Sequence, residues 1–421
     1  ASVGYDDFLF LDGSIRKDWS STADSQDNGV LTLGASGSFV FSNFIPKNNI
    51  FTFGKLRAGF AQAPQFPNVY QTSEIYNTGL AYGTFPTSST QSIPNNPNLK
   101  GGIREEKEYG IDLKFFNNRL SFDVSYFDRT DKELPSSLSL DASTGITGAL
   151  GNTGIQTYKG FEVAFGGTPI RTNNFERTIS ANFATLEREV VAIAPGITRN
   201  IIQSGNSNMG NVQLVEQVGE EWGAIYGSRI ARDANGKAKL TSTGTYVREL
   251  GVFLGNVLPD YTGGLTTSFV YKNLSLDLGF DFQEGGKYYS VSNSLINRTG
   301  VGIATVGDND LGNPKRDNVV STTGVNSPTT TILNSIVAPN SGGVLVEGVD
   351  SVTGLDVAYR MNTRTYYGNN LRQITEPFLE DASYIKWRTV RLGYTFNKKE
   401  LGKTPFEKIN VALYANNLWL I

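Results

Sequence analysis

The chain has 421 residues, of which 37 are Lys or Arg and 40 are Asp or Glu, and it contains neither His nor Cys. The lack of imidazole and thiol groups excludes His general bases, Cys nucleophiles and His/Cys zinc sites. A formal charge of -3 supplies no basic field for nucleic acid, which is therefore not expected as a partner. The sequence likewise predicts no catalytic residue, no metal and no cofactor.

The composition is typical of a β-rich chain. Hydrophobic residues make up only 39%, whereas Gly (46 residues) and aromatic residues (25 Phe, 19 Tyr and 4 Trp) are abundant. Apolar runs such as Val190–Ala194 are far shorter than the roughly 18 to 20 residues that a membrane-spanning helix needs. We therefore expect an all-β fold without a transmembrane helix.

Alternation of apolar and polar residues is the dominant pattern along the chain. In residues 120–126, Leu, Phe, Val and Tyr alternate with Ser, Asp and Ser, and residues 274–282 and 390–396 repeat this pattern. Such alternation predicts β-strands. The predicted strands cover residues 5–15, 30–42, 51–61, 106–116, 119–129, 160–167, 176–186, 261–272, 274–283, 384–396 and 408–416.

The connections between these strands alternate between long and short. Short turns on one edge and long loops on the other are typical of outer-membrane β-barrels, whose periplasmic turns are short and extracellular loops long. The pattern therefore predicts an antiparallel transmembrane barrel. The long loops cover residues 16–29, 62–105, 130–159, 187–260 and 284–383, and the short ones 43–50, 117–118, 168–175, 273 and 397–407.

The strand faces fit a barrel whose apolar side chains meet lipid and whose polar side chains line the lumen. A soluble β-sandwich would show the same alternation, with its apolar face turned inward. Strands of roughly 10 residues are long enough to cross a bilayer at a tilt, and aromatic residues at strand ends suit the interfacial girdles of a barrel. The girdle candidates are Phe115, Phe116, Tyr126, Phe127, Tyr394 and Phe396.

The long loops carry many aromatic residues. Aromatic rings stack on sugar rings or on peptide side chains, and loops on a rigid scaffold often carry binding residues. The same rings could instead pack the loops onto each other. The candidate substrate-binding residues are Tyr70, Tyr76, Tyr82, Phe85, Trp222, Tyr226, Tyr288, Tyr289, Tyr366 and Tyr367.

Four segments together resemble the SusC/RagA family of TonB-dependent outer-membrane transporters. They are residues 105–123 (EEKEYGIDLKFFNNRLSFD), 219–227 (GEEWGAIYG), 381–396 (DASYIKWRTVRLGYTF) and 410–418 (NVALYANNL). Each segment alone is a weak signal, but their order and spacing are fairly specific. The resemblance covers most of the chain and matches the C-terminal part of such a transporter.

This resemblance implies that residues 1–421 form part of a 22-stranded barrel in the bacterial outer membrane, with the plug domain and a terminal strand outside these residues. It also implies TonB-dependent active import of oligosaccharides or peptides. The implied partners are a SusD-like surface lipoprotein that acts as a lid, the TonB complex, which contacts the N-terminal part, and the lipid bilayer. In this scheme the protein is not an enzyme.

Two other functions remain open from the sequence. A passive outer-membrane porin would share the strand and loop pattern but would have no plug and no energised partner. A secreted β-rich glycan-binding protein would instead be soluble and monodisperse without detergent.

Overall fold

The computed structural model describes residues 1–46, 48–206, 209–324, 326–327 and 331–420. Its main element is a 13-stranded antiparallel sheet with the order β1-β2-β3-β4-β7-β8-β9-β10-β17-β18-β26-β27, in which β11 also pairs with β9. The strands of this sheet are β1 (Ser2–Tyr5), β2 (Leu9–Trp19), β3 (Gly29–Phe39), β4 (Phe51–Gln65), β7 (Gly102–Phe115), β8 (Leu120–Ser139), β9 (Gly148–Arg171), β10 (Phe175–Ala184), β11 (Glu187–Ala192), β17 (Tyr261–Tyr271), β18 (Leu274–Glu284), β26 (Tyr384–Asn397) and β27 (Lys408–Leu420).

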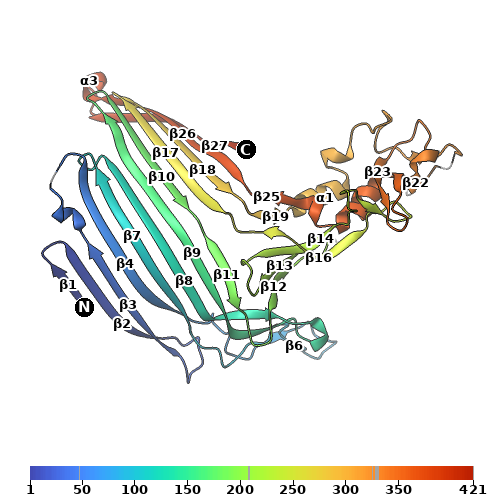
Figure 1. The fold of residues 1–421 in the computed structure, drawn as a ribbon, viewed down its shortest axis with the longest axis horizontal. Coiled ribbons are helices and arrows are strands. Elements are labelled where there is room, and N and C mark those ends of the chain that lie inside the picture. Colours follow the sequence, from blue (N-terminus) through green and yellow to red (C-terminus); the bar gives the residue numbers. More distant parts are fainter. Residues whose placement is uncertain (47, 207–208, 325, 328–330, 421) are drawn as a thin grey trace.

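Most connections alternate between short and long, as the sequence predicts, but the connections 20–28 and 140–147 on the long side are shorter than 40–50 on the short side. Short turns such as 172–174 and 272–273 lie together at the end of the sheet that also carries α3 (Lys398–Leu401), at the upper left of Figure 1. The long loops 66–101, 185–260 and 285–383 leave the opposite end. We call these two ends the short-turn rim and the long-loop rim.

Two predicted boundaries are wrong. The predicted strand 5–15 is a hairpin, because Asp6 and Asp7 adopt positive φ angles of 49° and 57° and turn β1 back onto β2. The predicted long loop 130–159 is mostly strand, since β8 and β9 stay paired up to Ser139 and Gly148. These extensions are rich in Gly, Ser and Thr, so they lack the alternation that marks the lower parts of both strands.

The apolar face of the sheet is exposed. Leu11, Ile15 and Leu413 lie on this outer face, with exposed fractions of 51%, 71% and 73%. In a soluble sandwich this face would be buried against a second sheet. Exposure along the whole sheet is what a lipid-facing surface requires.

Aromatic rings form a belt along the short-turn rim. Phe51, Phe115, Phe122 and Phe165 follow one another across β4, β7, β8 and β9, with neighbouring ring centroids 4.9 to 6.0 Å apart. Of the predicted girdle residues, Phe115 joins this belt, and Tyr394 and Phe396 contact each other near the end of β26. Tyr126 and Phe127 lie within β8 and not at its end, because the strand continues to Ser139, so their place in a girdle stays a prediction.

The long loops contain further short elements. The hairpin β5 (Tyr76–Thr78) and β6 (Ser88–Thr90) lies in loop 66–101. Loop 185–260 contains β12 (Arg199–Ser204), β13 (Gln213–Gln217), β14 (Ala224–Ile230), β15 (Lys239–Leu240) and β16 (Arg248–Asn256). Loop 285–383 contains β19 (Lys287–Tyr289), α1 (Val291–Thr299), β20 (Val319–Val320), β21 (Asn326–Ser327), β22 (Thr331–Leu333), β23 (Val344–Asp350), β24 (Asp356–Met361), α2 (Thr363–Thr365) and β25 (Leu379–Asp381). Among the described residues, no helix is long and apolar enough to span a membrane.

Candidate functional site

The inner face of the sheet carries a network of ion pairs around Arg57 of β4. The Arg57 guanidinium donates hydrogen bonds to Asp112 of β7 and to Asp123 of β8, both at 2.7 Å. It also donates to the Ser125 hydroxyl at 2.6 Å, and Lys55 lies 2.6 Å from Asp112. Paired charges satisfy one another without an apolar cover, so this face suits a hydrated lumen.

A second network lies near the other edge of the sheet. Arg391 of β26 donates to Asp277 of β18 at 2.9 Å and to the Asn410 side chain of β27 at 3.0 Å. Towards the long-loop rim, Arg388 donates through Nε to Asp281 at 2.8 Å. The polar lining of the sheet therefore extends across strands that lie far apart in its order.

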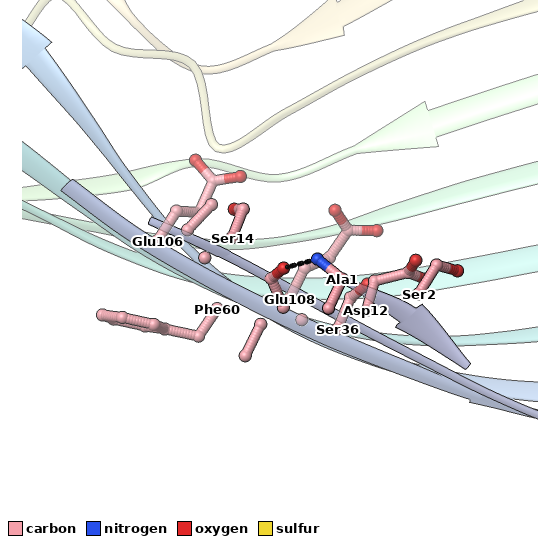
Figure 2. A pocket seen from close by; sticks show the side chains of 13 residues that line it. Ala1, Ser2, Asp12, Ser14, Ser36, Phe60, Glu106 and Glu108 are labelled. Carbon is pink, nitrogen blue, oxygen red and sulfur yellow. Dashed lines mark hydrogen bonds between the residues drawn. The ribbon is translucent and has the colours of Figure 1, made fainter. Parts of the chain in front are cut away.

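An open cavity of about 540 Å³ lies on the inner face of β2, β3, β4 and β7. Its carboxylates come from Asp12, Glu106 and Glu108. Figure 2 shows the Glu106 and Ser14 side chains on one side of these strands and the Phe60 ring on the other. The remaining wall consists mostly of small residues, namely Ala1, Ser2, Gly13, Gly34, Ala35, Ser36, Gly59 and Ala61. Because these side chains are short, this part of the wall leaves open space on the inner face of the sheet.

Residues 193–260, which follow β11, and loop 285–383 fold together into one unit beyond the long-loop rim, which we call the loop module (Figure 1). The short strand β15 pairs in parallel with β23. The core of the loop module consists of the buried side chains of Leu240, Val346, Tyr359 and Met361. The loop module therefore buries apolar side chains in its own hydrophobic core, whereas the apolar side chains on the outer face of the sheet are exposed.

Ser228 and Thr375 join the two loops by reciprocal hydrogen bonds. The Ser228 amide donates to the Thr375 hydroxyl at 3.1 Å, and the Thr375 amide donates to the Ser228 carbonyl at 3.0 Å. Both residues are buried. Buried polar groups that pair with each other fix one arrangement, so these bonds hold the two loops in register.

A stack of rings and guanidinium groups attaches the loop module to the sheet. The Arg188 guanidinium of β11 lies 3.8 Å from the Trp222 ring centroid and 5.0 Å from that of Tyr158 in β9. Arg129 of β8 lies on the Tyr158 ring at 3.7 Å. The Trp222 indole also donates to Glu216 at 2.8 Å. Cation–π contacts are worth about 0.5 to 2 kcal/mol, depending on their exposure to water, so this partly buried stack stabilises the junction.

Half of the predicted substrate-binding aromatics are exposed. Tyr82 is 82% exposed, and Tyr76, the least exposed of the four candidates on loop 66–101, is still 61% exposed. The exposed candidates are Tyr70, Tyr76, Tyr82, Phe85 and Tyr288. These rings are free to stack on a ligand, and their role stays a prediction.

The other five predicted aromatics make contacts within the loop module. Trp222 belongs to the stack, and Tyr226 lies beneath Arg199 at 4.1 Å and donates to Glu220. Tyr366 packs on the core of the loop module, where burial raises the pKa of its phenol. The Tyr367 hydroxyl donates to the Ala304 carbonyl at 2.9 Å, and Tyr289 packs against Phe378. The structure thus separates the ten residues into an exposed set and a packed set.

Sequence reasoning missed the charged residues that hold the site together. The pattern around Arg57 was visible, because Lys55 and Arg57 share a strand face and the adjacent predicted strand carries Glu108 and Asp112 on one face. Arg360 gave no such signal. Its side chain is fully buried in the loop module and donates to both oxygens of Asp310, at 2.5 and 2.7 Å.

An exposed apolar face, an ion-paired inner face and folded loops at a single rim define the wall of an outer-membrane β-barrel. Residues 1–334 match the family model described as TonB dependent receptor-like, beta-barrel. The chain therefore belongs to the TonB-dependent receptor β-barrel family, which confirms the SusC/RagA resemblance. Membership of this family implies an outer-membrane location.

Individual relatives agree with this assignment. TonB-dependent receptor P26 of Formosa agariphila is 24% identical, over 100% of this chain and 41% of the relative. TonB-dependent receptor SusC of Bacteroides thetaiotaomicron is 23% identical, over 64% of this chain and 28% of the relative. The chain thus spans about two fifths or less of the length of these curated relatives, which are receptors rather than enzymes.

The solved structure of the RagAB peptide transporter has the same fold. It superimposes with a TM-score of 0.73 over 100% of this chain and 43% of that chain, at 18% sequence identity. At this level of identity the likeness shows the fold alone.

Proposed function

We propose that this protein imports oligosaccharides or peptides across the outer membrane, using energy from the TonB system. The observation that carries the proposal is the combination of an exposed apolar outer face with an ion-paired inner face on one sheet. That combination suits a wall between lipid and a polar lumen. In this proposal residues 1–421 supply part of a multi-pass, 22-stranded barrel, and a plug domain that contacts TonB closes its lumen.

The proposal includes a SusD-like surface lipoprotein that covers the loop module. The loop module is large, has its own core and is fixed by buried hydrogen bonds, so it offers a rigid surface to a partner. SusC and the RagAB transporter, which resemble this chain, support a lidded importer over a porin. Neither the inner face nor the loops are assigned a bond-breaking role.

Uptake measurements in cells test this function. Cells with the full-length protein should accumulate fluorescently labelled oligosaccharides or peptides, and accumulation should stop when TonB is deleted or the proton gradient is collapsed. A porin would instead admit the same probes without TonB. TonB-independent uptake would therefore contradict the proposal.

A further inference from the structure

A second cavity of about 540 Å³ lies in the loop module, between the end of α1 and the start of α2. Three arginines line it: Arg298 in the last turn of α1, Arg316 in the following loop and Arg364 in α2. Its other lining residues are Asn, Thr and Gly, and no Asp or Glu is among them. The volume lies within the roughly 300 to 1,000 Å³ of small-molecule sites, and the charge is positive.

These arginines have no counter-charge in the described part of the chain. None of the three lies within 4.0 Å of a carboxylate there, unlike Arg57 and Arg360, which pair with Asp side chains. Arg316 is instead held by uncharged acceptors: its Nε donates to the Thr305 carbonyl at 3.2 Å, and its Nη2 donates to the Gly300 carbonyl and to the Thr305 hydroxyl. No carboxylate in the described part of the chain neutralises its positive charge, and its Nη1 has no hydrogen-bond partner there.

A fourth arginine adds to the positive charge near this cavity. Arg372 follows α2, and its buried Nε has no hydrogen-bond partner in the described part of the chain. Burial lowers the pKa of Arg372, and the nearby charge of Arg298 lowers it further. Like charges held close together repel one another, so a bound anion would stabilise this arrangement.

The uncharged lining favours a glycan over a peptide. Asn297 and Asn362 supply amide groups and Thr299 supplies a hydroxyl group, which match the hydroxyl groups of sugars. The buried Thr305 hydroxyl instead bonds to the Gly300 and Gly302 carbonyls and to Arg316. An arginine cluster can also bind an acidic peptide, but many other peptide sites use a free strand edge or apolar pockets, and no large apolar side chain lines this cavity. A single inorganic anion would fill only a small part of the volume.

We propose that this cavity binds an acidic oligosaccharide, whose sulfate or carboxylate groups pair with Arg298, Arg316 and Arg364. The inference rests on the proposed import function and narrows its substrate class to anionic glycans. Guanidinium groups bind both kinds of anion through charge-assisted hydrogen bonds, so the cavity alone leaves the choice between sulfate and carboxylate to experiment.

Calorimetry on the full-length protein, purified in detergent with its lipoprotein partner, tests this inference. The probes are a sulfated galactan tetrasaccharide, the same tetrasaccharide without sulfate, tetragalacturonate and tetraglutamate. We expect the sulfated sugar or the galacturonate to bind at least about tenfold more tightly than the neutral sugar. This binding should weaken as salt is added, because salt screens the charges. A preference for one of the two identifies the anionic group.

Substitutions of the lining arginines test whether the acidic sugar binds in this cavity. Arg298→Gln combined with Arg364→Gln should weaken binding of the acidic sugar by at least about tenfold. Arg119→Gln is the matched control, because Arg119 is an exposed arginine at the opposite rim of the sheet and its loss should leave binding unchanged.

Three results would overturn the inference: equal affinity for neutral and acidic sugars, no binding of either acidic sugar, or unchanged binding by the double variant. Binding of tetraglutamate alone would also overturn it, in favour of an acidic peptide. TonB-dependent uptake is measured separately in cells, so an importer of neutral sugars or of peptides would keep the proposed function while this inference fails.

Discussion

Arg57 and Asp123 are joined by a 2.7 Å hydrogen bond, although β7 separates their strands, β4 and β8. The guanidinium crosses β7 at Gly110, where an added Cβ would lie only 2.4 Å from the Arg57 Cζ and Nε. The missing side chain therefore provides the space for a bridge across three strands. This relationship links a glycine in the sequence to the charge network of the inner wall.

Replacing this glycine should break the bridge. Gly110→Ala should displace the Arg57 guanidinium and cost about 1 to 3 kcal/mol of unfolding free energy, because hydrogen bonds to a charged group are lost. In an Arg57→Met background the same change should be nearly neutral. Urea unfolding in lipid vesicles measures all four proteins, and additive effects of the two substitutions would contradict the account.

Neighbouring residues on opposite faces of β2 test which face meets lipid. Ile15 is exposed on the outer face, whereas Ser14 lines the inner cavity. Ile15→Arg should cost about 2 to 4 kcal/mol if it lies near the bilayer midplane, and Ser14→Arg should cost much less. The amount of folded protein in the outer membrane, read from heat-modified migration on gels, measures this. Equal recovery of both variants would refute the assignment of faces.

The ion pair in the loop module predicts a dependence on pH. The hydrogen bond from Arg360 lowers the pKa of Asp310 below its ordinary value of 3.8. The pair therefore contributes its full stability above that value, and the contribution is lost as pH falls through the lower pKa of the folded state. Asp310→Asn should speed hydrogen exchange in β24 relative to the native protein at about pH 6, and this difference should shrink progressively as pH falls below 3.8. A difference that persists at low pH would assign the effect to packing instead.

The stack at the junction of sheet and loop module predicts graded effects at Trp222. Trp222→Ala removes both the contact with Arg188 and the hydrogen bond to Glu216, so hydrogen exchange in β13 and β14 should increase. Trp222→Phe keeps a ring on Arg188 and should cause a smaller increase. If both substitutions leave exchange unchanged, the stack does not hold the junction.

The sheet could be predicted from the sequence because its two faces meet different environments. The predicted strands 274–283 and 384–396 match β18 and β26 to within one residue. They could be recognised because one face of each strand needs apolar side chains and the other needs polar side chains. The upper parts of β8 and β9 lack this pattern. Both of their faces can meet water beyond the bilayer, so the alternation that identifies a strand is not required there.

The loop module could not be predicted, because its contacts join residues far apart in the chain. Ser228 and Thr375 are separated by 147 positions, and neither carries a local signal for its partner. The aromatic candidates show the same limit. Tyr82 and Tyr366 look alike in the sequence, yet one is exposed and the other packs on a core.

Native mass spectrometry of the protein, extracted from its own outer membrane in mild detergent, tests the central claim most directly. A lidded importer predicts that the chain is released together with a bound lipoprotein, and that this complex survives gentle activation. A chain that is released alone, or that stays soluble without detergent, would contradict the account.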